Sequence, residues 1–545
     1  MRMRRRFTAL LPLLVAPLSP TAALEGQRHQ QAAGGPQERL GSVEFQISCN
    51  AEAQVRFGRA LALLHSFWWP EAARAFDAVA EADPTCAMAY WGKALVHRGN
   101  WFAGLPSPDA AGAGLAAAER AAALNAPTER ERGYVAAVRT LFADAETNDY
   151  ASRARAYEEE MRQLQERHPD DPEAAIFYAL AVSANTPASD RSFERQKRAG
   201  TILEALLDER PDHPGLAHYM IHTYDTPATA HLGQAAALRY GEIALSVPHA
   251  QHMPSHIFTR LGMWDESIRA NNASAESALA YERAEGMTDV SFDRAHAWDY
   301  LAYAHLQKGQ DALALAVLDD VRNSSAEPSI ATDYAFAAIP ARYALERGRW
   351  GEAASLPVRS SPGFRAGEAI SHFARGLGAA RSGDPGPAGE EVRALAGIRD
   401  ALRQSSEAYW SEAVEAQRLA VAGWIAHARG LSDDALRLIR EAAEIEKRID
   451  KHPVAPGPIV AASELLGDLL LEINRPAEAQ QAYVAALESE PNRARLVFGA
   501  ARAAELAGDT DAARTRYTEY LRLMAAADGG REELDAANAF VARSR

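Results

Sequence analysis

The sequence predicts an all-α fold in which pairs of helices stack into an α-solenoid. Three observations lead to this prediction. Runs of alternating apolar and polar residues, which mark strands, are nearly absent from the 545 residues. Alanine, the strongest helix former, is abundant along the chain. Patterns of small and aromatic residues return at fixed spacings, which is typical of repeat architectures and suits a chain too long for one compact core.

The first segment, residues 1–23, resembles a secretory signal peptide. Four arginines precede residue 7, an apolar run covers residues 7–16, and Thr21-Ala22-Ala23 offers small residues for cleavage. The arginines also fit the twin-arginine type of signal. We therefore expect an exported protein, periplasmic or extracellular. Residues 24–45, rich in glutamine and glycine, are expected to form a disordered linker.

Cys49 and Cys86 are the only cysteines. An even pair in an exported chain predicts one structural disulfide, with a reactive thiol as the alternative.

Helical repeats are expected from residue 46 onward. Ala479 is followed by Tyr483 and Pro491, and Ala513 with Tyr517 repeats the first two positions 34 residues later. Small residues let paired helices approach closely, while aromatic residues fill the space between pairs.

The same spacing recurs near the N-terminus at Ala72, Phe76 and Pro84. The pattern resembles the tetratricopeptide-repeat (TPR) superfamily, in an exported, bacterial-type member. The resemblance implies roughly eight to eleven stacked helix-turn-helix pairs, curved around a concave groove where ligands usually bind.

We divide the array into three parts. Residues 46–321 form an N-terminal TPR-like array that holds a histidine cluster, residues 322–400 form middle helical repeats, and residues 401–545 form a C-terminal TPR array. Residues 322–334 are expected to be a linker or a long loop.

Histidine is concentrated in one part of this array, since nine of the 16 histidines fall between His213 and His305. Three expected helices carry stripes spaced by three and four residues, which return to one helix face. The stripes are His218, His222 and Asp225; His249, His252 and His256; and His296, Asp299 and Tyr303.

The repeat frame places the stripes side by side. Counting from Gly262 and Gly309 gives His252 and Asp299 the same repeat position, and His218 takes that position when counted from Pro211. In the family that the chain resembles, these first-helix positions face the concave groove. Neighbouring helices would then carry the stripes about 10 Å apart.

The stripes predict a transition-metal site. Histidines four apart on a helix can present two imidazoles to one ion. Ligation by nitrogen without thiolate suits zinc, copper, iron or nickel, and suits calcium poorly. The candidate metal ligands are His218, His222, Asp225, His249, His252, His256, His296 and Asp299, and either aspartate could instead orient a ligating imidazole.

Two other interpretations of the stripes stay open. One is a polar groove that binds an acidic peptide or a small anion, and the other is a purely structural polar network. Pro254 lies inside the second stripe and removes a helical hydrogen bond. The helix therefore begins either near His249 or only at Met253.

The same counting places further residues on the concave face. They are Tyr303, Arg342, Glu464, Asp468 and Arg502, with His65 within reach of the groove. The alternative is that each is a solvated groove residue. Glu464 and Asp468 form an acidic pair that suits a basic partner.

The leading hypothesis is an exported TPR protein whose groove binds a transition metal together with a peptide, protein or small-molecule ligand. The first alternative is a non-catalytic scaffold for a peptide or partner protein. The second is a metal-dependent hydrolase or oxidoreductase built on the same residues. No catalytic residue is assigned, because nucleotide-binding, nucleophile-elbow and zinc-protease motifs are absent from the sequence.

Composition limits the partners. The formal net charge of −15 disfavours nucleic acid, whose phosphates need a basic face. No segment is long and apolar enough to predict a membrane span.

Overall fold

The computed structural model describes residues 38–102, 104–187, 190–361 and 363–543. Within these residues the chain forms helices and no strand, and Val290 and Ala326 make an isolated β-bridge. The helices up to the histidine cluster are α1 (Ala51–His65), α2 (Trp69–Ala82), α3 (Ala87–Arg98), α4 (Pro108–Leu124), α5 (Glu129–Thr140), α6 (Tyr150–Arg167), α7 (Pro172–Ala184), α8 (Glu194–Leu207), α9 (Pro214–Tyr224), α10 (Ala230–Ile243), α11 (Pro248–His252), α12 (Pro254–Arg260) and α13 (Trp264–Glu285). Those that follow are α14 (Phe292–Gln307), α15 (Asp311–Arg322), α16 (Ile330–Leu345), α17 (Trp350–Ala354), α18 (Arg365–Arg381), α19 (Pro385–Gln404), α20 (Ala408–Ala428), α21 (Ser432–Ile449), α22 (Ala462–Glu472), α23 (Pro476–Ser489), α24 (Ala494–Ala507), α25 (Thr510–Leu523) and α26 (Glu532–Arg543).

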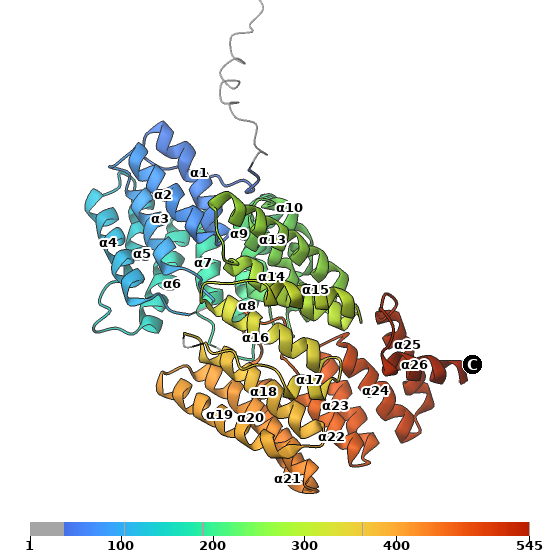
Figure 1. Cartoon of the computed structure of the whole chain (residues 1–545). Helices are drawn as coiled ribbons and strands as arrows, with labels where there is room; N and C mark the ends of the chain where they lie inside the picture. Colours follow the sequence, from blue (N-terminus) through green and yellow to red (C-terminus); the bar gives the residue numbers. More distant parts are fainter. Residues whose placement is uncertain (1–37, 103, 188–189, 362, 544–545) are drawn as a thin grey trace, which may run out of the picture. The chain divides into compact units, whose positions relative to one another are not determined.

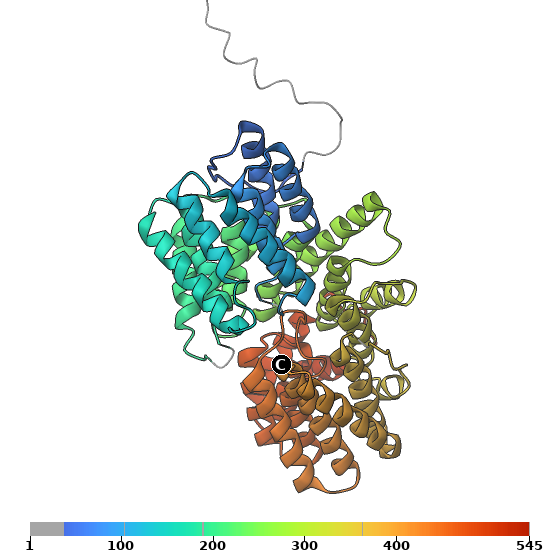
Figure 2. The same ribbon diagram turned by 90° about the vertical axis from the view of Figure 1, so that its left-hand side faces the viewer.

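Consecutive helices pack against each other in pairs, and each pair packs on the next (Figures 1 and 2). Helix α1 packs on α2, α9 on α10 and α23 on α24, while α3, α7 and α16 contact helices two places along the chain. This arrangement confirms the predicted all-α solenoid of TPR-like helix pairs.

Small and aromatic residues interlock as their spacing predicted. Ala479 is fully buried, and the ring of Tyr483 fills the space between two glycines on the neighbouring helices. A Cβ atom on Gly467 or on Gly499 would lie 2.5 Å from that ring. Only a residue without a side chain allows the ring to enter there.

The predicted disordered linker, residues 24–45, extends too far along the chain, because its last residues pack against the helices. The Arg39 N–H donates to Ser246 Oγ at 2.8 Å, and Leu40 and Phe45 are buried in the core of the first helices. Residues 39–45 therefore pack against the helices. The predicted signal peptide, and the linker up to residue 37, lie outside the described residues.

Cys49 and Cys86 form a disulfide, as predicted, with their Cα atoms 5.3 Å apart. Cys49 lies two residues before α1, and Cys86 is the N-cap of α3. The bridge therefore ties together the starts of these two helices.

The predicted linker at residues 322–334 is shorter than expected, because α15 ends at Arg322 and α16 begins at Ile330. At the expected boundary near residue 400 the packing is continuous. Leu395, Ile398 and Val414 belong to the same apolar cluster on both sides of that position.

Among the described helices, none has the length and apolar character needed to cross a membrane.

The second histidine stripe lies on a bent helix. Pro248 begins α11 and Pro254 begins α12, where the missing N–H costs least. Met253 between them keeps right-handed helical angles, with φ −51° and ψ −37°. The helix thus begins near His249, and Pro254 divides it without reversing the chain.

Residues 450–461, between α21 and α22, cover the inner face beside the histidines. The Tyr300 hydroxyl and the Arg342 guanidinium donate to backbone carbonyls of this segment at 2.8–3.3 Å. Lys451 Nζ lies 3.2 Å from Asp225 Oδ2. Because of this cover, residues expected to line an open groove are buried.

Candidate metal centre

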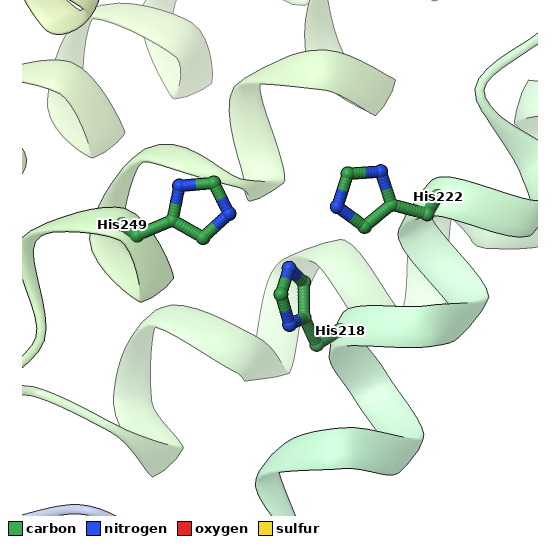
Figure 3. Close-up of side chains that lie close together, drawn as sticks. All are labelled: His218, His222 and His249. Carbon is green, nitrogen blue, oxygen red and sulfur yellow. The ribbon is translucent and has the colours of Figure 1, made fainter. Parts of the chain in front are cut away.

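Three histidines from two helices converge at one end of the cluster (Figure 3). His218 and His222 lie one turn apart on α9, and His249 lies on α11. One nitrogen from each ring lies within 4.8 Å of the nitrogens from the other two. We call these three residues triad A.

Hydrogen bonding leaves a bare nitrogen on the central ring of triad A. His218 Nδ1 lies 2.6 Å from the carbonyl oxygen of His65, so Nδ1 carries the proton and Nε2 presents a lone pair. The Nε2 atoms of His218, His222 and His249 are all buried and have no hydrogen-bond partner in the protein. An imidazole pinned through Nδ1 to a carbonyl is the usual orientation of a metal-ligating histidine.

Three further histidines form triad B. His252 lies on α11, His256 on α12 and His296 on α14, and again one nitrogen from each lies within 4.8 Å of the other two. The ring centroid of His252 is 4.2 Å from that of His296 and 5.0 Å from that of His256.

Two side chains orient the rings of triad B. His252 Nδ1 lies 2.7 Å from Asn271 Oδ1, and the amide nitrogen of Asn271 donates to the Ser267 carbonyl at 2.8 Å. The amide therefore presents its oxygen to His252, which donates from Nδ1 and leaves Nε2 bare, buried and without a protein partner. His256 donates from Nδ1 to Asp225 Oδ2 at 2.9 Å, so its Nε2 is bare as well.

In each triad, one aromatic ring contacts all three histidines. The ring of Phe67 lies 4.5, 5.6 and 6.0 Å, centroid to centroid, from the three histidines of triad A. The ring of Tyr300 lies 4.6, 5.4 and 5.2 Å from those of triad B. Phe67 has φ 52°, in the left-handed region that a bulky residue rarely adopts. This strained backbone holds an apolar cover over triad A.

Burial lowers the pKa of every histidine in both triads, and it brings the pKa of His218 to about 3. For His256 the burial is opposed in part by the hydrogen bond and charge of Asp225. The six rings are His218, His222, His249, His252, His256 and His296. At neutral pH they are uncharged, which is the form that binds metal ions.

Asp225, a predicted ligand, acts in the structure as a hydrogen-bond acceptor behind triad B. Its Oδ2 holds His256, while Arg260 Nε lies 2.9 Å from Oδ1 and Lys451 Nζ lies 3.2 Å from Oδ2. Burial opposes the charge of this carboxylate, but Lys451 and Arg260 hold its pKa well below the usual range. Asp225 is therefore placed to orient a ring, the second role that the sequence left open.

Three other predicted residues lie apart from both triads. Asp299 pairs with Arg342 at 3.1 Å, and burial raises its pKa to about 6. The Tyr303 hydroxyl accepts from Arg493 at 2.8 Å. Arg502 is exposed and pairs with a glutamate of its own helix at 2.7 Å. Within the described residues, Asp299 belongs to neither histidine group.

The acidic pair on α22 is occupied by the chain's own arginines. Glu464 is fully buried and accepts from Arg493 Nε at 2.9 Å. Asp468 accepts from the Tyr483 hydroxyl at 2.6 Å and from Arg381 Nη1 at 2.5 Å. The pair is thus part of an internal ion-pair network and leaves little for a basic partner.

His65 lies behind triad A in a third group, with Glu173 and His213. Glu173 accepts from His65 Nε2 at 3.0 Å and from His213 Nε2 at 2.8 Å. His65 Nδ1 also contacts the Tyr219 hydroxyl at 2.9 Å. With its ring fixed in this way, His65 presents the backbone carbonyl that orients His218.

A cavity of about 670 Å³ lies beyond Arg260 and Lys451. Its other lining residues include Tyr334, Phe373, Tyr409, Trp410 and Glu446. Arg260 and Lys451 both contact Asp225, which in turn holds His256. The contacts from this cavity to triad B therefore pass through Arg260 or Lys451 and then through Asp225.

The residues that orient or cover the rings were not predicted from the sequence. Phe67, Asn271 and Glu173 have no spacing relation to the histidine stripes, whereas Tyr300 lies four residues after His296 on the same helix. Only the expectation that a carboxylate orients an imidazole pointed toward this outer shell.

No protein-family model matches the sequence, and no curated protein matches it. Solved structures similar to the chain include two of human IFIT1 as a dimer, one with m7Gppp-AAAA and one with PPP-AAAA. The first is 11% identical, with a TM-score of 0.36, over 80% of this chain and 90% of that one. The second is also 11% identical, with a TM-score of 0.35, over 88% and 96%. Likenesses of this size carry no inference about function.

Proposed function

We propose that this protein is an exported TPR-like protein whose buried histidine centre binds a transition metal. The single observation that carries the proposal is the set of bare imidazole nitrogens. The Nε2 atoms of His218, His222, His249 and His252 are buried and lack a protein partner, while Nδ1 of His218 and Nδ1 of His252 are each held by a hydrogen bond.

Energetics support a ligand at these nitrogens. A buried polar atom without a partner costs about 1–3 kcal/mol, so four such atoms cost several kcal/mol together. A purely structural polar network would instead pair these atoms with one another or with the backbone. Because the rings are neutral and present lone pairs, a cation satisfies them and an anion does not.

The donor set limits the metal. Neutral imidazole nitrogens suit zinc, copper, iron or nickel, whereas calcium and magnesium need oxygen ligands. Bonds to these ions are about 2.0–2.1 Å long, so two nitrogens on one ion are at most about 4.2 Å apart. Three nitrogens spaced evenly around one ion lie about 3.5 Å apart at this bond length, so a triad whose nitrogens are 4.8 Å apart would contract by about 0.7 Å per ring.

The test is the metal content of the protein purified without a histidine tag, before and after loading with zinc, copper, iron and nickel. We expect stoichiometric metal in the parent and a large loss in a His222→Ala/His256→Ala double variant. The control is His231→Ala, because His231 is exposed on α10 and belongs to neither triad. Absence of metal from the loaded parent would refute the proposal and favour a peptide or small-molecule ligand in the cavity.

A second candidate is a metal-dependent hydrolase or oxidoreductase. It is favoured by the ligand count, since three protein ligands leave a coordination position open for water or substrate, as catalytic sites do. Hydrolysis or redox turnover that appears on metal loading, and is lost in the same double variant, would distinguish it from a protein that only binds the metal.

A further inference from the structure

We propose that the centre is binuclear, with one ion in each triad, and that it is suited to copper(I). This inference rests on the proposed function, because it assigns the number and kind of ions to the same histidines.

The ring nitrogens of the six histidines form two groups of three. Within each triad one nitrogen from each ring lies within 4.8 Å of the other two, and among the described residues these six histidines form no single larger group. Six nitrogens around one ion would all have to lie within about 4.2 Å of each other. A single ion therefore fits one triad or the other, and the remaining triad would keep buried lone pairs without a partner.

Each triad also has its own supporting residues. In triad A the carbonyl of His65 orients a ring and Phe67 covers the site. In triad B Asn271 and Asp225 orient two rings, while Tyr300 covers the site. Independent orientation and cover are what a complete site needs, and a spare set of ligands does not.

The two sites are direct neighbours. The centroid of His222 lies 6.1 Å from that of His256, and the centroid of His249 lies 6.3 Å from that of His252. These distances between triads are no longer than the 6.4 Å between His222 and His249 inside triad A. Two bound ions would therefore be close enough to share a bridging ligand.

Charge selects the ion. All six ligands are neutral, and the carboxylate of Asp225 is already paired with Arg260 and Lys451. The carboxylate of Asp299 is paired with Arg342 in the same way. Two divalent ions would bury four positive charges without an anionic ligand, which is costly in a low-dielectric interior. Copper(I) halves that charge, and copper is among the metals that imidazole suits.

The test is an anaerobic titration of the full-length protein with copper(I) against a chromophoric chelator, with metal and protein counted in the same sample. We expect two copper ions per chain in the parent. We expect one in His222→Ala, which damages triad A, and one in His252→Ala, which damages triad B. X-ray absorption should show metal–metal scattering in the parent and in neither variant.

Each outcome has a separate meaning. No retained metal of any kind would refute the proposed function itself. One ion per parent chain, at saturation, would overturn the binuclear centre and leave the proposed function standing. Two ions of zinc that displace copper(I) would overturn the assignment of the ion alone. The parent stoichiometry decides the number of ions even if a variant fails to fold.

Discussion

Asn271 fixes the proton of His252, and Asn271→Leu should weaken metal binding at triad B. The asparagine accepts from His252 Nδ1 at 2.7 Å, which forces the lone pair onto Nε2. Leucine has a similar volume but no acceptor, so His252 can move its proton to Nε2, where it blocks the metal. Asn271→Asp keeps an oxygen at this position and serves as the matched variant.

The magnitude follows from this one hydrogen bond. In the leucine variant, the metal-binding tautomer leaves a buried Nδ1–H without a partner, at a cost of about 1–3 kcal/mol. Loss of such an outer partner typically costs 10- to 100-fold in metal affinity, or about 1.4–2.7 kcal/mol. We therefore expect a loss of about 10- to 100-fold in Asn271→Leu and retention of affinity in Asn271→Asp.

The measurement is a competition titration with a chromophoric chelator. It is done in a His222→Ala background, so that triad B is observed alone. Circular dichroism of each variant checks that the fold is kept. A loss below about threefold in Asn271→Leu, or an equal loss in both Asn271 variants, would refute the tautomer argument.

Three further predictions concern stability. Gly499→Ala should lower the free energy of unfolding by about 1–3 kcal/mol, because its Cβ would lie 2.5 Å from the Tyr483 ring, which another glycine confines on the opposite side; an unchanged melting temperature would contradict this. Replacing Cys49 and Cys86 by serine opens a loop of 37 residues and should cost about 4 kcal/mol by chain entropy, measured by denaturant unfolding with the reduced parent as control. Burial raises the pKa of Glu446 to about 8, so the folded state holds a proton that the unfolded state loses near pH 4.5. Stability should therefore fall as the pH rises from about 4.5 to 8, and this part of the slope should vanish in Glu446→Gln; an identical pH profile in both proteins would count against it.

Much of the fold is predictable from the sequence because its signals are local. The spacing of Ala479 and Tyr483 predicts how neighbouring helices pack, because the helices concerned are close together in the sequence. Segment boundaries were harder, since they depend on distant partners. Leu40 and Phe45 follow a glutamine-rich stretch, yet they are buried because helices far along the chain provide an apolar surface for them.

The positions of the candidate ligands were also predictable from local signals, whereas their distant partners were not. Helical spacing and the repeat frame brought six histidines to one face, where the structure also places them. What the frame could not supply is the partner across that face. Asp299 lies on the inner face as counted, but Arg342 on α16 meets it there. Whether the triads bind a metal stays a prediction.

The largest difference between the expected and the observed groove comes from one segment. TPR-like stacking leaves an inner face open to ligands, but here residues 450–461 lie on that face. The backbone carbonyls of this segment accept hydrogen bonds from Tyr300 and Arg342. A segment with four prolines or glycines in its middle cannot continue a helix, so it crosses the face in turns and bends and needs these donors. Asp450 and Lys451, the first residues of this segment, form ion pairs with Arg260 and Asp225 respectively. The carboxylate of Asp225 therefore connects the segment to triad B. The surroundings that bury triad B therefore include a contact between residues more than 220 positions apart, which no local pattern records.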